Sequence, residues 1–143
     1  MNNYYEAETR DYTFTKGDTA ILRFEFVEKG TGNPIDLRQW NSKCTLLDYI
    51  TNQPITALQK YHDDSIDGGK GIYYFGDTQL PDGITLDTVG KIVIIFKDVD
   101  TKTLKPGIYP FDIEFSISTL EGDTFRFTIK GNLIITWEAT ENV

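Results

Sequence analysis

The stretch FDIEFSISTLEGDTFRFTIKGNLIITW, residues 111–137, decides the fold because apolar and polar side chains alternate along nearly all of it. A two-residue period is typical of strands with one buried and one exposed face. The alternation breaks at LEGD, residues 120–123, where a glycine can adopt the positive φ of a tight turn. The stretch therefore predicts a hairpin of two long strands with Gly122 in its turn.

The inward face of this hairpin is expected to carry its large apolar side chains. These are Phe111, Ile113, Phe115, Ile117, Phe125, Phe127, Ile129, Leu133, Ile135 and Trp137. Because Trp137 is in phase with Leu133 and Ile135, we expect it to be a core residue. Its replacement by alanine would then cost about 3–5 kcal/mol.

The same alternation recurs at residues 21–27, and weaker strand patterns follow the same rule. The weaker candidates are residues 11–15, 44–50 and 71–75. The run KIVIIFK, residues 91–97, is apolar on both faces, which predicts a central strand covered on each side or a strand against a partner.

Helical periodicity is nearly absent, and all five prolines are expected at the boundaries of strands. They are Pro34, Pro54, Pro81, Pro106 and Pro110. Helical turns are expected at most at residues 56–61 and at residues 37–40, where Asp36 would be the cap. The polar, glycine-rich stretch 52–88 is expected to hold the longest loops.

About seven to nine short strands without a linker predict one antiparallel two-layer β-sandwich over residues 11–143, with a closed barrel as the alternative. Residues 1–10 form a polar segment before it. We expect this segment to be an arm in which Tyr4 and Tyr5 contact a neighbouring subunit, with a disordered tail as the alternative.

Composition excludes several classes of function. The formal net charge is −8 and no basic run occurs, which is unlike a nucleic-acid-binding protein. Neither a signal peptide nor a membrane-spanning apolar stretch is found, so we expect no membrane insertion. The single cysteine, Cys44, excludes an internal disulfide and is interpreted as a small buried residue, not a reactive thiol.

Catalytic motifs are also weak, and the chain is predicted to be neither an enzyme nor a cofactor-binding protein. The only histidine, His62, stands beside Asp63 and Asp64, a pattern that permits a proton relay. An exposed polar loop residue is the favoured interpretation, because no nucleophile motif accompanies it. One histidine and one distant cysteine are too few ligands for zinc.

The segment DDSIDG, residues 63–68, has the opening of a calcium loop, with oxygen ligands at Asp63, Ser65 and Asp67. The twelfth position is Tyr74 where a calcium-binding EF-hand has glutamate, so a solvated turn is favoured over a looser calcium site.

Two blocks of sequence together carry a family resemblance. They are YTFTKGDTAILRFEFVEKGTGNPIDL, residues 12–37, and GKIVIIFKDVDTKTLKPGIYPFDIEFSISTLEGDTFRFTIKGNLIITWEAT, residues 90–140. This layout resembles the immunoglobulin-like N-terminal domain of phage baseplate upper proteins and related tail-fibre attachment domains. The resemblance implies an immunoglobulin-like sandwich, made in the host cytoplasm, that packs against other virion proteins in a symmetric assembly and holds receptor-binding parts.

Other assignments stay open at this point. In that family the domain usually leads into a longer chain, whereas the expected last strand of this sequence lies just before Val143. A stand-alone tail, neck or capsid-decorating protein is therefore an alternative expectation. A carbohydrate or cell-surface binding module is another, because sugars stack on exposed aromatic rings. The candidates for such a face are Tyr4, Tyr5, Tyr73 and Tyr74, although packing in the core or at a subunit contact is more common for such residues.

Overall fold

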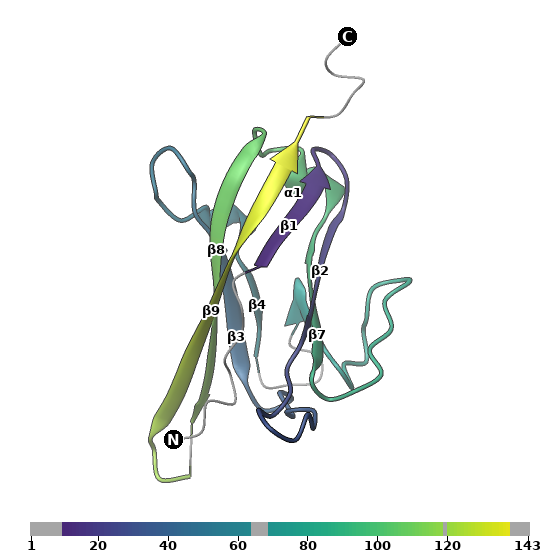
Figure 1. The fold of residues 1–143 in the computed structure, drawn as a ribbon, viewed down its shortest axis with the longest axis vertical. Helices are drawn as coiled ribbons and strands as arrows, with labels where there is room; N and C mark the ends of the chain where they lie inside the picture. The colour runs from purple at the N-terminus through teal and green to yellow at the C-terminus, as the bar shows by residue number, and fades with distance from the viewer. Residues whose placement is uncertain (1–9, 64–68, 119, 138–143) are drawn as a thin grey trace.

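The computed structural model describes residues 10–63, 69–118 and 120–137 (Figure 1). Within them, nine strands form two sheets that pack face to face. Regular helix is limited to two short turns, η1 (Thr56–Leu58) and α1 (Asp98–Thr101). The predicted all-β, immunoglobulin-like sandwich is therefore confirmed.

The larger sheet has six strands in the order β1-β9-β8-β3-β4-β5. Their bounds are Arg10–Thr15 (β1), Thr124–Thr136 (β9), Gly107–Ser118 (β8), Asn41–Leu46 (β3), Lys60–His62 (β4) and Gly69–Lys70 (β5). The predicted hairpin is β8 and β9, which pair antiparallel along their whole length. One pairing departs from the antiparallel expectation, because β1 lies parallel to β9.

The smaller sheet has the order β2-β7-β6. Its strands are Ala20–Glu25 (β2), Lys91–Phe96 (β7) and Ile72–Tyr74 (β6). Residues 92–96 of β7 are all buried, on both faces of the strand. The apolar run therefore forms a covered central strand, as its sequence predicted.

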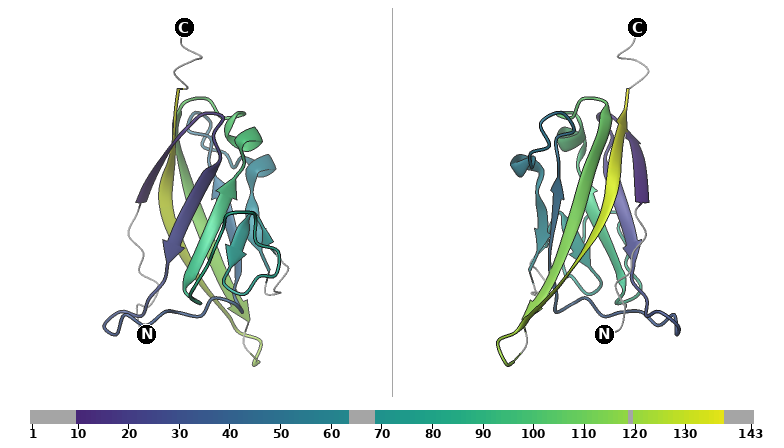
Figure 2. Two further views of the ribbon diagram at one scale, coloured as in Figure 1. Left: turned by 90° about the vertical axis from the view of Figure 1, so that its right-hand side faces the viewer. Right: turned by 60° about the vertical axis from the view of Figure 1, so that its left-hand side comes forward.

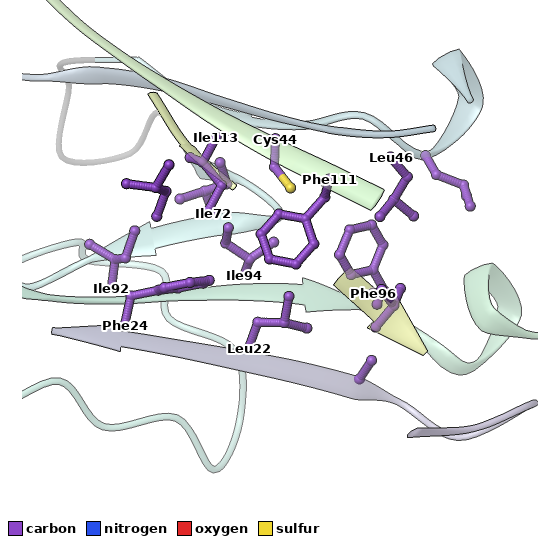
Figure 3. Packing of buried hydrophobic residues seen from close by; sticks show 14 of the residues in the cluster. Leu22, Phe24, Cys44, Leu46, Ile72, Ile92, Ile94, Phe96, Phe111 and Ile113 are labelled. Carbon is purple, nitrogen blue, oxygen red and sulfur yellow. The ribbon is translucent and has the colours of Figure 1, made fainter. Parts of the chain in front are cut away.

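Aromatic side chains from both sheets meet in the core. Phe115 of β8 stacks on Phe127 with 4.7 Å between ring centroids, and it meets Phe26 edge-on at 5.3 Å. Figure 3 shows Phe24 of the smaller sheet and Phe111 of the larger sheet, whose ring centroids are 6.5 Å apart in the core. The inward phase predicted for these alternating residues is confirmed.

The expected burial of Trp137 is wrong, since 57% of this residue is exposed. Its phase is that of buried Ile135, but β8 reaches only to Gly107, opposite Ile135, and β1 ends opposite Thr136. Trp137 thus lies just past the sheet. Phe125, at the other end of β9, is 48% exposed because the tip of the hairpin projects past the smaller sheet (Figure 2).

Pro110 does not stand at a strand boundary, as expected, but inside β8. The last β3 partner of β8 is Leu46, opposite Phe111. Beyond that point the Pro110 carbonyl accepts the Leu47 N–H at 2.8 Å. The missing N–H of the proline therefore removes no bond from the β3–β8 ladder, which explains why the strand tolerates it.

The short helical elements were predicted in part. The turn η1 falls within residues 56–61 as expected. Residues 37–40 form a turn and not a helix, in which Asp36 accepts the Arg38 N–H at 3.0 Å. The stretch 52–88 contains β4, β5 and β6 as well as loops, so the expectation of loops there was too broad.

Replacing Gly122 by valine is expected to cost about 1 kcal/mol or more, since its φ of 88° disfavours a branched side chain. No atom lies within 4 Å of a Cβ built at this position, so backbone strain and not a clash is the cause. The melting temperatures of Gly122→Val and of the neighbouring control Glu121→Val would measure this loss of stability. Equal melting temperatures would show that the turn does not need a positive φ.

Candidate functional site

The two long sides of the sandwich differ in how the sheets are joined. On one side, called the closed side, the chain passes from β5 in the larger sheet to β6 in the smaller one through Gly71. Gly71 bridges to Tyr61 of β4, and its carbonyl accepts the Ile95 N–H of β7 at 2.8 Å. Its φ of 92° makes this change of sheet possible. The closed side is therefore hydrogen-bonded across both layers.

A buried polar cluster lies beside this crossing. The Nε2 atom of His62 is 2.9 Å from both carboxylate oxygens of Asp77, and only 1% and 5% of the two side chains are exposed. Asp77 also accepts the Tyr74 N–H at 2.8 Å. The His62 ring stacks on Tyr74 with centroids 3.8 Å apart. The expectation of an exposed loop histidine is wrong, because β4 turns His62 inward against β6.

Tyr74 extends the cluster into the core. Its hydroxyl lies 2.7 Å from Ser42 Oγ and 2.9 Å from the Trp40 carbonyl oxygen. Burial raises the pKa of Tyr74 above its ordinary value, so the phenol stays protonated and can donate. Tyr74 is only 1% exposed, so it belongs to the core, as the favoured interpretation had it, and not to a sugar-binding face. The cluster ties β3, β4 and β6 together.

Cys44 is fully buried on β3, which confirms the interpretation as a small core residue. Burial raises the pKa of its thiol, so the reactive thiolate is disfavoured.

Two other predicted sites, the contact tyrosines of the arm and the calcium-loop candidate, lie wholly or mostly outside the described residues. Tyr4 and Tyr5 lie outside the described residues, as do Ser65 and Asp67 of the calcium-loop candidate. Across residues 10–63, 69–118 and 120–137, no group of three or more His, Cys, Asp or Glu side chains is arranged to hold a metal ion. In the same ranges, no helix has the length and apolarity needed to cross a bilayer.

The opposite, open side of the sandwich lies between the edges of β1 and β2 (Figure 2). The turn after β1 joins these strands, and the Tyr12 hydroxyl donates to the Arg23 carbonyl at 3.1 Å. Within the described residues, each strand has a strand partner on one edge only, β9 for β1 and β7 for β2. Strand edges that lack such a partner can pair with another chain.

A groove of about 490 Å³ spans β2, from Arg10 at the start of β1 to β7 and the loop before it. Its charged lining residues are Arg10, Arg23, Glu25, Asp87 and Lys91, and Leu86 and Val93 add apolar surface. Lys91 pairs with Asp87 at 2.8 Å. Within the described residues, Arg23 forms no ion pair. The groove is therefore weakly basic in a chain that has a net charge of −8.

The loop after β3, the turn α1, the start of β8 and the end of β9 lie at one end of the sandwich, the upper end in Figure 1, and each carries an exposed large apolar residue. This apolar end consists of Tyr49, Ile50, Val99, Ile108 and Trp137.

Two contacts hold segments at this end of the sandwich against their neighbours. The Tyr49 ring meets Tyr109 edge-on at 5.3 Å and occupies the space that a side chain at Gly107 would need. The loop that carries Tyr49 and Ile50 therefore lies against the start of β8, next to Ile108. Thr101 of α1 accepts the Gly17 N–H at 3.1 Å, which holds α1 against the turn after β1.

Comparisons with known proteins leave the family open. No protein-family model and no curated protein matches the sequence. Among solved structures, the chain is similar to AggA, the major subunit of aggregative adherence fimbriae type I from Escherichia coli. The identity is 13% and the TM-score 0.31, with 90% of this chain and 91% of that chain covered. A likeness of this size carries no argument about function.

Proposed function

We propose that this chain is a non-enzymatic structural component of a bacteriophage virion, a tail or baseplate protein that docks on neighbouring subunits through the apolar end. The observation that carries the proposal is the gathering of Tyr49, Ile50, Val99, Ile108 and Trp137 at one end of the sandwich. The resemblance of residues 12–37 and 90–140 to phage baseplate and fibre-attachment domains supports the choice of assembly.

The apolar end is suited to a subunit contact. Trp137 and Ile108 are more than half exposed, although each large apolar side chain would gain free energy by leaving water. Grouped exposed apolar side chains mark interaction surfaces, and tryptophan and tyrosine are enriched at the centres of interfaces. The surface is also held in place, because Tyr49 packs on Tyr109 and its hydroxyl bonds to the Pro106 carbonyl at 3.4 Å.

The direct test of this proposal is the composition of purified virions from cells that carry the gene. Mass spectrometry is expected to find the chain in the particles at a fixed ratio to other structural proteins. Particles that are complete and infectious without the chain would overturn the proposal.

Replacing Trp137 or Ile108 by serine is expected to lower the amount of chain in virions at least tenfold, because the subunit contact loses an anchor. The melting temperature should hardly change, since surface substitutions usually stay within about 0.5 kcal/mol. Leu120→Ser is the matched control, a fully exposed leucine at the opposite end. Equal incorporation of all three variants would exclude the apolar end as the contact.

A further inference from the structure

We propose that the free edge of β2 binds residues 2–9 of a second copy of this chain as an added strand, with the acidic side chains of that segment against Arg10 and Arg23. This inference rests on the proposed assembly of subunits, and it names a second interface and its occupant.

The backbone of β2 presents the groups that an added strand needs. Phe26, just past β2, donates its N–H to Gly90 on the β7 side at 2.9 Å. Because strand residues alternate in direction, Ile21, Arg23 and Glu25 turn their N–H and C=O groups to the other edge. There the Arg23 carbonyl accepts the Tyr12 hydroxyl, and within the described residues the free edge has no strand partner. Edges of this kind bind extended peptides by strand addition.

The groove beside this edge selects the charge of the occupant. Arg23 lies on β2 itself, and Arg10 at the start of β1 lines the same groove. Lys91 is already paired with Asp87, and Arg10 hydrogen-bonds to the Tyr12 hydroxyl. Arg23 is therefore the main basic group available to a ligand, with Glu25 beside it in the groove. Arginine binds carboxylates with two parallel hydrogen bonds, which favours an acidic segment over a neutral one.

Residues 2–9, NNYYEAET, fit these requirements by their sequence. Glu6 and Glu8 are separated by one residue and would point to the same side of an extended strand. Eight residues in this conformation span about 26 Å, enough to cover the six residues of β2 at about 3.3 Å each. Tyr4 and Tyr5 add large side chains that bury area at low entropic cost.

A second copy is favoured over the same copy as the source of this strand. The Tyr12 hydroxyl of β1 is 3.1 Å from the Arg23 carbonyl oxygen of β2, so β1 of the same copy already lies next to the middle of this edge. Arg10, at the start of β1, lies toward the end of β2 and away from Ile21, because a short turn beyond Thr15 joins the two strands. The same chain would have to fold back at Arg10 to pair with β2, whereas a neighbour is free of this constraint. Such head-to-tail contacts close into rings or extend as filaments.

A charge-swap experiment on the full chain tests this interface. The wild-type chain is expected to associate with increasing concentration in sedimentation equilibrium. Arg23→Glu and the double variant Glu6→Lys/Glu8→Lys should each weaken association at least tenfold. An equimolar mixture of the two variants should restore association. The basic segment of Glu6→Lys/Glu8→Lys can bind the acidic β2 edge of Arg23→Glu, and the acidic segment of Arg23→Glu can bind the unchanged β2 edge of the double variant.

The control is Arg126→Glu, the same charge reversal at an exposed arginine on the outer face of the larger sheet, which should associate like the wild type. Circular dichroism of each variant checks that it is folded. A wild-type chain that stays monomeric, or a mixture that fails to associate, would overturn this inference. Presence of the chain in virions would be unaffected by that outcome, so the two proposals fail separately.

Discussion

Replacing Asp77 by alanine is expected to lower the free energy of unfolding by about 3–5 kcal/mol, because removing one partner of a buried pair leaves the other without compensation. Asp77 is the acceptor for His62 Nε2 and also for the Tyr74 N–H. Both donors lie in the core, where water cannot replace the lost carboxylate. The stack of His62 on Tyr74 would lose its anchor as well.

Urea denaturation of Asp77→Ala and Asp87→Ala would measure this effect. Asp87 is the matched control, because it belongs to the same loop and pairs with Lys91 but is exposed to solvent. Its variant should unfold at the wild-type urea concentration, since exposed ion pairs add little stability. If both variants unfolded at the same midpoint, the buried pair of His62 and Asp77 would be refuted.

Phe115→Ala is the second variant with a large expected effect, again about 3–5 kcal/mol, from lost burial and the cavity left behind. Phe115 is fully buried, and its ring contacts Phe127 of β9 and Phe26, which lies just past β2. Few flexible neighbours are available to fill the space, because the surrounding side chains are themselves large and packed.

Phe125→Ala is the matched control for the core. Phe125 has the same inward phase on the same hairpin, but it is 48% exposed and loses less area from burial. Thermal unfolding should therefore show a much larger shift for Phe115→Ala than for Phe125→Ala. Similar shifts would mean that the hairpin is buried along its whole length.

The regular part of the fold could be predicted because its signal is local. The alternation in β8 and β9 and the apolar run of β7 depend only on neighbouring residues, so their strands and inward faces follow from the sequence. Trp137 marks the limit of this reasoning. Its phase was right, but its burial depends on whether another strand lies opposite, and β8 ends at Gly107.

The candidate sites depend on contacts between distant residues, which periodicity does not contain. His62 and Asp77 are 15 residues apart in a stretch with no clear pattern. They meet because β4 of the larger sheet faces β6 of the smaller sheet at the closed side. The free edge of β2 follows from the strand order, which alternation alone does not determine. A signal was present in the segment GIYYF, residues 71–75, whose strand pattern brings Tyr74 into the core.

The parallel pairing of β1 and β9 has a mechanical consequence. Tension that draws the start of β1 and the finish of β9 apart would slide two neighbouring strands past each other lengthwise. All the backbone hydrogen bonds between β1 and β9 would then bear the load at once in shear, instead of breaking one after another from one end. A subunit pulled from both ends in this way would unfold only at a high force and in one step, which suits a subunit that bears mechanical load.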